Sequence, residues 1–261
     1  MLCLKHFDLW GLILLKEKDV TNSLLIVGDV HGKFAHLNQL IAMTKCFAVI
    51  VVGDFGFWRS SLLYKEENND TMFLHQRTPF GVPVYFVDGN HEDHNSLEQL
   101  VIKHGKNNPI DVGGNCWYIP RGCVFEITNP FTNNKKTILG LGGAYSIDWK
   151  QRIPQVSWFE QEQLRYSDLI DLNTDNNVDI IISHTCPECL LRDVANTCQI
   201  DYNRIIERQS EKLLDHVFTL IKPKYWFFGH WHQRDTYQVE QTTFELLDMI
   251  PHRGCFKLFE V

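Results

Sequence analysis

The chain has 261 residues, 44% of them hydrophobic, and a formal net charge of −7 at pH 7. This length and composition allow a large buried core, and α/β folds of this size commonly form one domain. The acidic balance argues against a nucleic-acid or anionic-membrane partner, because either favours a basic surface, although a local basic groove stays compatible with it. The eight cysteines are scattered along the chain, which predicts buried, reduced thiols in a reducing compartment.

The N-terminal segment contains seven consecutive uncharged residues, 9–15, with the sequence LWGLILL. This stretch is too short to span a bilayer, and the segment lacks the basic leader and small-residue cleavage site of a signal peptide. We therefore expect residues 1–22 to be an extension packed against a single domain formed by residues 23–261. The protein is expected to be cytoplasmic, without a membrane partner.

The first predicted strand, 24–27, leads into the motif GDVHG and then into an amphipathic helix at 33–45. Asp29 and His31 are two residues apart. In extended backbone they point to the same side, so one metal ion can bind both. The alternative is that Asp29 caps the following helix, a common role of Asp between a strand and a helix.

The second predicted strand, 48–53, is the one around which the chain is organised. Its sequence, AVIVVG, is a continuous apolar run of mostly β-branched residues, which predicts a strand buried on both faces. Asp54 follows at the carboxyl end of this strand, where open α/β sheets place their ligand sites. Residues 59–78 are then expected to be mixed helix and loop.

The third predicted strand, 83–87, is followed, after Asp88, by the residues GNHED. Asn90 is a neutral, monodentate ligand, which suits a metal site that already holds enough negative charge. Its alternative role is that of a turn residue after Gly. A lone histidine such as His91 is more commonly an ordinary loop residue, but its position directly after a candidate ligand favours a functional role.

The middle of the chain contains three short strand-like runs, 116–119, 124–127 and 137–141, separated by Asn, Gly and Pro turns. This pattern predicts an antiparallel set, with 129–136 as a hairpin or loop tip. The glycines of the segment GLGGAYS at 140–146 imply a close approach of the backbone to another strand or to a bound phosphate, and both remain open.

Arg152 follows this glycine-rich segment and is a candidate phosphate contact. The polar stretch 157–169 predicts a helix. The run 178–184 predicts a strand that ends in His184. The CxxC at 186–189 has no second cysteine pair nearby, so we expect neither a structural zinc nor redox chemistry there.

A second long helix is predicted within 204–221, because apolar residues recur along it before Pro223. The strand 225–228 leads into the motif GHWH, whose His230 and His232 form another same-side pair. Three terminal runs are expected to form antiparallel strands: 237–239, 244–247 and 256–261.

Five predicted core strands thus each deliver a metal-competent side chain at one end. The candidate ligands are mixed oxygen and nitrogen donors without a thiolate, which suits Mn²⁺, Fe or Zn²⁺. They are Asp29, His31, Asp54, Asn90, His184, His230 and His232. We interpret Asp54 as a carboxylate shared by two ions, because two metals about 3.5–4 Å apart can orient and activate a water between them.

The ordered blocks GDVHG, GDFG, GNHE, SH and GHWH resemble those of the calcineurin-like metallophosphoesterase superfamily over residues 24–235. The resemblance implies a four-layer α/β/β/α sandwich, in which two mixed sheets pack face to face with helices outside. It also implies that two divalent metal ions, with Mn²⁺ the first candidate, bind a bridging hydroxide that hydrolyses phosphate mono- or diesters.

The resemblance also implies a role for each candidate ligand. One metal would be held by Asp29, His31, Asp54 and His232, and the other by Asp54, Asn90, His184 and His230. His91 would be the acid that protonates the leaving group. Asp93 is a candidate for orienting His91, since carboxylates often orient catalytic histidines.

The protein serine/threonine phosphatase branch carries GDxxDRG, whereas this chain has GDFGFW with only Arg59 nearby. The GHWH ending resembles instead the phosphodiesterase-like and bacterial or phage branches, so a phosphoprotein substrate is not expected. Trp58 and Tyr145 are among the aromatic residues near the predicted ligands, and such residues can stack on a nucleobase. Packing of the core or its rim is the alternative for them.

The sequence therefore predicts a metal-dependent phosphoesterase that acts on a small phosphate ester, with a nucleotide as one candidate substrate. A nuclease acting on DNA or RNA is the alternative within enzymes, and the acidic balance counts against it. A catalytically silent binding scaffold of the same fold is the alternative outside enzymes. No predicted ligand is missing from the sequence, which counts against the scaffold.

Overall fold

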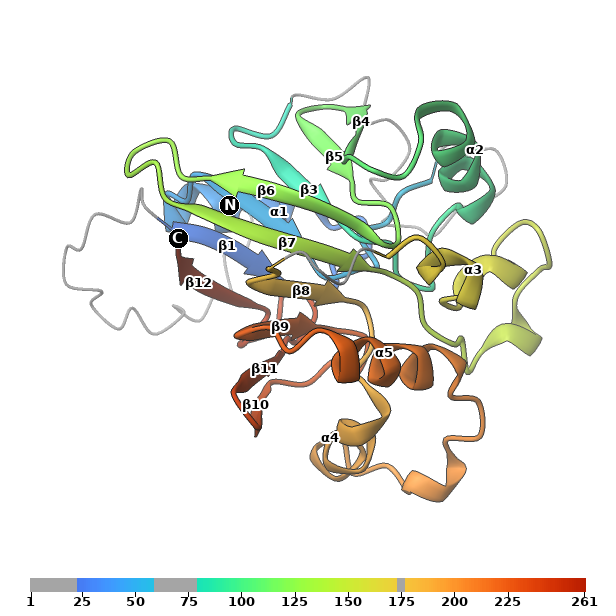
Figure 1. Ribbon diagram of the computed structural model, residues 1–261. Coiled ribbons are helices and arrows are strands. Elements are labelled where there is room, and N and C mark those ends of the chain that lie inside the picture. The colour runs from blue at the N-terminus through green and yellow to red at the C-terminus, as the bar shows by residue number, and fades with distance from the viewer. Residues whose placement is uncertain (1–22, 59–78, 173–176) are drawn as a thin grey trace, which may run out of the picture.

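The computed structural model describes residues 23–58, 79–172 and 177–261 (Figure 1). The predicted extension 1–22, the segment 59–78 and Arg59 within it lie outside these residues. The described part of the chain folds into two six-stranded sheets with helices.

The first sheet combines strands from the N-terminal half of the chain with the C-terminal strand. In spatial order its strands are β12 (Phe256–Glu260), β1 (Ser23–Val27), β2 (Ala48–Val51), β3 (Val84–Phe86), β5 (Cys116–Tyr118) and β4 (Ile110–Gly113). The four central strands run parallel to one another, while β12 and β4 at the two edges are antiparallel to their neighbours.

The second sheet has the same pattern of strand directions. In spatial order its strands are β10 (Asp235–Val239), β11 (Thr242–Leu246), β9 (Tyr225–Phe228), β8 (Ile180–Ser183), β7 (Lys135–Leu141) and β6 (Cys123–Thr128). The central strands are parallel, and the edge strands β10 and β6 are antiparallel to their neighbours. Figure 1 shows β7 and β8 pointing one way and β6 the other.

The described helices connect these strands. They are α1 (Phe34–Thr44), α2 (His94–His104), α3 (Tyr166–Leu169), α4 (Leu191–Thr197) and α5 (Gln209–Leu220). Single turns of 3₁₀ helix are η3 (Trp149–Gln151), η4 (Glu160–Glu162), η5 (Glu188–Leu190) and η6 (Tyr202–Arg204). Among these described elements, none is a helix with the length and apolar character that crossing a membrane requires.

The two sheets pack face to face across a shared apolar layer. Leu24 and Ile26 of β1 belong to this layer, and Ile180 and Ile182 of β8 meet them from the second sheet. The alternate residues Leu25 and Val27 point to the opposite face of the first sheet. Both sets of side chains are therefore buried, which explains why these strands are apolar at every position.

Helices cover the outer face of each sheet and complete the predicted four layers. On the first sheet, α1 contributes Leu37 and α2 contributes Leu97 to a buried cluster. On the second sheet, Val194 of α4 and Leu214 of α5 pack in the same way, and Figure 1 shows α4 and α5 together on one side of that sheet. The α/β/β/α sandwich expected from the sequence is confirmed.

The grouping of the middle strands differs from the sequence prediction. The runs 116–119, 124–127 and 137–141 predict one antiparallel set, but only β6 and β7 pair in this way. The strand β5 lies in the first sheet, parallel to β3 and antiparallel to β4. A run of three residues such as CWY does not indicate which sheet will bury it, so this prediction was wrong.

The segment 157–169 is not the continuous helix that its pattern predicts. It holds only the turn η4 and the four-residue α3. The carbonyl oxygens of Gln161, Glu162 and Gln163 accept hydrogen bonds from Arg121 at 2.8, 3.1 and 2.7 Å. Because these acceptors are used by a buried guanidinium, they are not available for a helical ladder.

Among the described strands and α-helices, three have no counterpart in the sequence prediction: α2, β4 and α4. The helix α2 begins directly after the GNHED motif, and its N-cap is Asp93, whose side chain accepts hydrogen bonds from the backbone N–H and the hydroxyl of Ser96. The GNHED motif was interpreted only as a source of metal ligands and catalytic residues, although its last residue also begins a helix.

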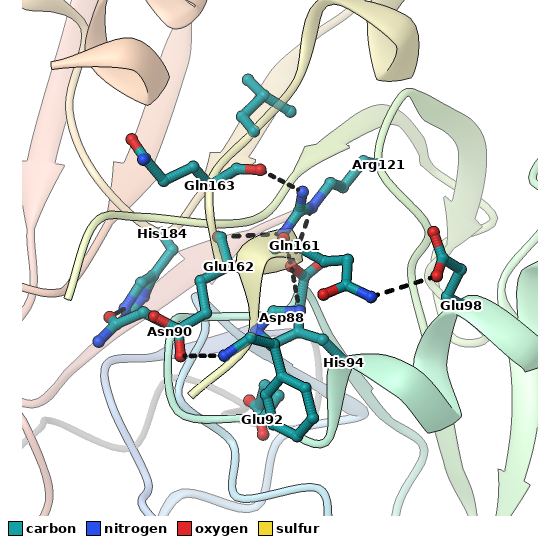
Figure 2. Close-up of polar contacts among 12 residues, drawn as sticks. Asp88, Asn90, Glu92, His94, Glu98, Arg121, Gln161, Glu162, Gln163 and His184 are labelled. Atoms are coloured by element: carbon teal, nitrogen blue, oxygen red, sulfur yellow. Dashed lines mark hydrogen bonds and ion pairs between the residues drawn. The ribbon is translucent and has the colours of Figure 1, made fainter. Parts of the chain in front are cut away.

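A buried ion pair stands just beyond β3. Asp88 is fully buried and accepts hydrogen bonds from Nε and Nη2 of Arg121 at 2.9 and 2.6 Å, while Tyr118 donates to its other oxygen. Burial alone would raise the pKa of Asp88, but Arg121 and His94 hold that pKa below its ordinary value. Arg121 thereby joins the end of β3 to the segment around η4 (Figure 2).

We predict that Asp88→Ala destabilises the protein by about 3–5 kcal/mol, because it leaves the buried guanidinium of Arg121 without its counter-ion. Urea denaturation measures the change. The matched control is Glu126→Ala, which removes a surface pair with Lys135, where N and O lie 2.6 Å apart and both side chains are about half exposed. That control should cost less than about 1 kcal/mol. Equal losses in the two variants would contradict the prediction.

Candidate metal centre

Polar side chains gather where the central strands of both sheets end. Asp54 follows β2 and Asn90 follows β3 in the first sheet, whereas His184 follows β8 and His230 follows β9 in the second. Parallel strands place their carboxyl ends at one edge of a sheet, and the two sheets bring these edges together. The ligands predicted from the sequence form one connected cluster.

One group of candidate ligands surrounds Asp29. Its Oδ2 lies 2.9 Å from Nε2 of His232 and 3.9 Å from Nε2 of His31, and the two imidazole nitrogens are 3.3 Å apart. Ligand atoms about 2.0–2.2 Å from one ion stand about 3–3.5 Å from each other. The three side chains thus fit a single divalent cation.

A second group surrounds His184, which is fully buried. Its Nε2 lies 3.5 Å from Oδ1 of Asp54 and 3.1 Å from Oδ1 of Asn90. The ring of His230 is 5.0 Å away, centroid to centroid. Asp29, Asp54 and His184 also offer ligand atoms that all lie within 4.8 Å of one another.

Asp54 faces both groups. Its Oδ2 lies 3.8 Å from Nε2 of His31, and its Oδ1 is the atom nearest to His184. Oδ1 also accepts a hydrogen bond from the backbone N–H of His91 at 2.8 Å, which fixes the rotation of the carboxylate. One oxygen of Asp54 is thus directed toward each group of ligands.

The structure excludes the capping alternative for Asp29. The N-cap of α1 is Lys33, which makes no side-chain capping bond. Oδ1 of Asp29 accepts from the backbone N–H of His230 at 3.1 Å, whereas the buried Oδ2 makes no hydrogen bond of normal geometry. A buried carboxylate oxygen that makes no hydrogen bond of normal geometry, although two imidazole nitrogens lie beside it, suits a metal ligand. The residues present therefore fit a divalent metal.

The backbone carries strain at this cluster. Four of the candidate ligands have a positive φ between 44° and 69°: His31, Asp54, His230 and His232. Non-glycine residues rarely adopt this conformation, which costs about 1–3 kcal/mol each and is concentrated at functional sites. The sequence analysis assumed extended backbone for the pair at 29 and 31. The side chains do meet, but a left-handed turn brings them together.

Two glycines allow the carboxylates to approach the backbone closely. A Cβ at Gly89 would lie 2.0 Å from Oδ1 of Asp54, and a Cβ at Gly229 would lie 2.2 Å from Oδ1 of Asp29. Any side chain at either position would push the carboxylate out of place. The glycines that directly precede Asn90 and His230 are thus part of the site.

The charges of the cluster are strongly coupled. Burial alone would raise the pKa of Asp54, but His184 and the other imidazoles hold it well below its ordinary value. Burial alone would lower the pKa of His184. The carboxylates of Asp54 and Asp29 outweigh burial and raise this pKa to about 10. Burial and the neighbouring His184 lower the pKa of His230 to about 3.

Glu92 holds the loop that follows Asp54. The carboxylate is fully buried and accepts three backbone N–H groups, from Phe55 at 2.7 Å, Gly56 at 3.1 Å and Phe57 at 2.6 Å. These bonds fix the backbone immediately beyond the strained Asp54. Glu92 lies within the motif GNHE, but the motif by itself predicted no role for it. Three consecutive N–H donors can be seen only after the loop folds around them.

His91 and Asp93 flank Glu92. The His91 ring is partly exposed, and its centroid lies 5.6 Å from that of His31, so it borders the ligand cluster. Asp93 uses its oxygens on Ser96 as the N-cap of α2. These capping bonds are one reason for an acidic residue at position 93. The orientation of His91 by Asp93 stays a prediction.

The predicted substrate contacts differ in their surroundings. Arg152 lies beside the cluster, where Nη1 donates to the hydroxyl of Ser146 at 2.7 Å and faces Glu162 at 3.1 Å. Trp58 is only 6% exposed and packs near Phe159, with ring centroids 6.2 Å apart. This burial favours the packing alternative for Trp58. Tyr145 is half-buried, and no structural observation assigns it a substrate.

The glycine-rich segment 140–146 approaches protein rather than an anion. A Cβ at Gly142 would lie 2.3 Å from Oδ1 of Asp88. This favours close backbone approach as the reason for the glycines. At the end of the segment, Ser146 contacts Asn90 directly, and sequence analysis gave this serine no role.

Comparison with known proteins agrees with the site. The family model described as calcineurin-like phosphoesterase matches residues 23–234. The chain belongs to the calcineurin-like phosphoesterase family. The superfamily predicted from the five motifs is confirmed. Members of this family are hydrolases that act on phosphoester bonds, so the predicted class of enzyme is confirmed as well. The phosphodiesterase-like and bacterial or phage branch stays a prediction.

The chain is similar to the following proteins. The lariat debranching enzyme of Schizosaccharomyces pombe (strain 972) is 24% identical over an aligned length of 243 residues, and the match covers 84% of this chain and 50% of that protein. The chain thus spans about half the length of this curated relative. The phosphopantetheinyl hydrolase of Mycobacterium tuberculosis has a TM-score of 0.49 and 15% identity over 92% of this chain and 96% of that one. The 5'-nucleotidase of Candida albicans has a TM-score of 0.41 and 14% identity over 87% of this chain and 45% of that one.

We predict that Glu92→Gln destabilises the protein and weakens its metal binding. The amide supplies one oxygen where the carboxylate supplied two, so at least one buried N–H loses its acceptor at a cost of about 1–3 kcal/mol. Urea denaturation and Mn²⁺ titration measure the two effects. The control is Glu98→Gln on α2, whose carboxylate is 40% exposed. Unchanged stability in Glu92→Gln would show that the three bonds do not hold the loop.

We also predict that metal binding releases a proton from His184. With its pKa at about 10, this imidazole is charged at pH 7 and must lose its proton before it binds a metal. Metal affinity should therefore rise as the pH increases toward 10. Calorimetric titration of metal-free protein with Mn²⁺ at pH 7, in two buffers of different ionisation enthalpy, measures the proton count.

The expected heat differs between the two buffers by an amount that corresponds to at least about one released proton. The hydrogen bond to Asp29 also raises the pKa of His232, so this ligand adds to the proton count. The exposed His216 provides a control, because His216→Asn should leave the proton count unchanged. Identical heats in both buffers would contradict the prediction.

Proposed function

We propose that the chain is a dinuclear metal-dependent hydrolase of phosphate mono- or diesters, built on a single domain of residues 23–261. The observation that carries this proposal is the placement of Asp54. Its two oxygens are directed toward two separate ligand groups, one around His31 and one around His184. This arrangement allows one carboxylate to be shared by two ions.

The ligand assignment follows from the two groups. Asp29, His31, Asp54 and His232 would hold one ion, and Asp54, Asn90, His184 and His230 the other. Two divalent cations, when bound, neutralise the charge of a phosphoryl group and lower the pKa of a water that acts as the nucleophile. Mn²⁺ is our first candidate, because the donors are imidazole, carboxylate and amide groups without a thiolate; Fe and Zn²⁺ are compatible with the same set.

His91 is proposed as the acid that protonates the leaving oxygen. Its backbone N–H is bound to Asp54, which places the residue at the edge of the ligand cluster, and its ring is partly exposed. The imidazole can therefore reach a substrate without itself being a ligand. A positioned general acid of this kind contributes about 10²–10⁴-fold to the rate.

A nucleotide-like ester is the substrate class that the surroundings favour. Trp149 is 37% exposed and lies 5.7 Å from Trp158, centroid to centroid, in the turn between Ser146 and Arg152. Both of these neighbours contact Asn90. An exposed aromatic ring in the segment between two residues that contact Asn90 can stack on a base, which contributes about 1–3 kcal/mol.

A nucleic-acid diester is the second candidate. It is favoured by the lariat debranching enzyme, the relative that matches 84% of this chain. The net charge of −7 counts against a long nucleic-acid footprint. A silent scaffold remains the third candidate, and it is distinguished by metal binding without turnover.

We predict that His91→Ala lowers kcat by about 10²–10⁴-fold while leaving the binding of metal unchanged, because a general acid acts on the leaving group and holds no ion. The assay uses p-nitrophenyl phosphate, bis-p-nitrophenyl phosphate, a 5'-nucleotide and a branched RNA, each with Mn²⁺. The matched control is His104→Ala at the exposed end of α2, which should keep wild-type activity.

The substrates separate the candidate functions. Turnover of the small esters or the nucleotide supports the proposal, and faster cleavage of the branched RNA supports the second candidate. Bound Mn²⁺ with no turnover of any ester would favour the scaffold. A protein that takes up no Mn²⁺ would overturn the dinuclear site itself.

A further inference from the structure

A buried chain of polar groups lies behind Asn90, on the side away from His184. We propose that Ser146, Glu162 and Arg152 are positioning residues that fix which end of the Asn90 amide faces the metal centre. The expected effect on metal binding rests on the proposed function, since Asn90 is a ligand of the proposed second ion. The geometry of these residues stands independently of any metal.

The contacts form a continuous path. Nδ2 of Asn90 donates to Oγ of Ser146 at 2.9 Å, and Ser146 donates in turn to Oε2 of Glu162. Nη1 of Arg152 donates to the same Oγ at 2.7 Å and lies 3.1 Å from Oε1 of Glu162. Figure 2 shows Asn90 beside His184, with the carboxylate of Glu162 nearby.

All four side chains are shielded from solvent. Asn90 is 3% exposed, Ser146 and Glu162 are 2% exposed, and the side chain of Arg152 is 7% exposed. Water is therefore not freely available to replace a missing partner. Each hydrogen bond in the path must be satisfied by another member of it.

The chemistry of the end members decides the direction of every bond. Burial raises the pKa of Glu162 to about 7, so the group is a carboxylate above that pH. A carboxylate only accepts hydrogen bonds, so the hydroxyl hydrogen of Ser146 then goes to Glu162. A guanidinium only donates, so it occupies one lone pair on Oγ of Ser146. The serine can then only accept from Asn90. The amide must therefore turn its NH₂ toward Ser146 and its Oδ1 toward His184.

This orientation is the one that a metal ligand needs. The amide oxygen can bind a cation, whereas the amide NH₂ cannot. An isolated Asn side chain has no preference between two orientations related by a half-turn. Glu162 and Arg152 fix the direction of the Ser146 hydroxyl, and this hydroxyl in turn fixes the orientation of the Asn90 amide. Residues that orient metal ligands in this way typically affect metal affinity by about 10–100-fold.

The inference also gives Arg152 a function that does not require substrate. Its Nη groups are used within the protein, by Ser146, by Glu162 and, at 3.4–3.5 Å, by the backbone oxygen of Asn90. The predicted phosphate contact would compete with these bonds. The structure therefore favours a positioning role for this arginine over a direct one.

Two variants test the inference. Ser146→Ala removes the link between Asn90 and Glu162. Glu162→Gln keeps the shape of the side chain but can donate to Ser146, which frees the serine hydroxyl to donate to Asn90 and lets the amide turn over. The matched control is Glu160→Gln, on the same turn η4 but exposed. Denaturation midpoints show that each variant folds, and Glu162→Gln decides the matter if Ser146→Ala does not fold.

The first readout uses metal-free protein and is independent of activity. The side-chain NH₂ signals of Asn90 in a ¹⁵N-resolved NMR spectrum, with their NOEs to Ser146, report the orientation of the amide. We expect a single ordered NH₂ pair in the wild type and in Glu160→Gln. In the two test variants we expect shifted signals and loss of the contacts to position 146.

The second readout is calorimetric titration with Mn²⁺. The test variants should bind the second ion about 10–100-fold more weakly, while the first ion binds as in the wild type. Unmoved Asn90 signals and two wild-type affinities in both variants would overturn the inference. A wild-type protein that binds fewer than two ions would instead overturn the proposed function, and the NMR result would still decide the orientation of Asn90.

Discussion

The site depends on one contact between the two sheets. His184, at the end of β8, places Nδ1 2.9 Å from the carbonyl oxygen of Val52 and Nε2 3.5 Å from Oδ1 of Asp54, both just beyond β2. This contact brings the carboxyl ends of two parallel strand sets to the same place. The apolar layer between the sheets determines their separation, and so determines which ligands can share an ion.

Buried carboxylates support the ligands from behind. Asp88 joins β3 to the segment around η4 through Arg121, Glu92 holds the loop after Asp54, and Glu162 acts on Asn90 through a serine. Each accepts hydrogen bonds from groups that are distant in the chain. Such bonds in a medium of low dielectric restrict the strained loops to one conformation.

The predictions from sequence succeeded where a local pattern had a single physical cause. A strand buried on both faces must be apolar at every position, so β1, β2 and β8 could be located from their composition alone. The family could be predicted because five short motifs occur in a fixed order. The pattern failed for β5 and for residues 157–169, because sheet membership and the hydrogen bonds from Arg121 depend on distant parts of the chain.

The sequence by itself determined the chemical types of the candidate ligands, their positions at the ends of apolar strands and the layered fold. Only the tertiary structure decided how those ligands approach one another, through left-handed turns at positions such as His31 and His232. It also decided that Trp58 is packed away from solvent and that Ser146 lies against Asn90. The physical reason is that hydrogen-bond partners separated by tens of residues leave no periodic signal in a sequence, whereas burial does.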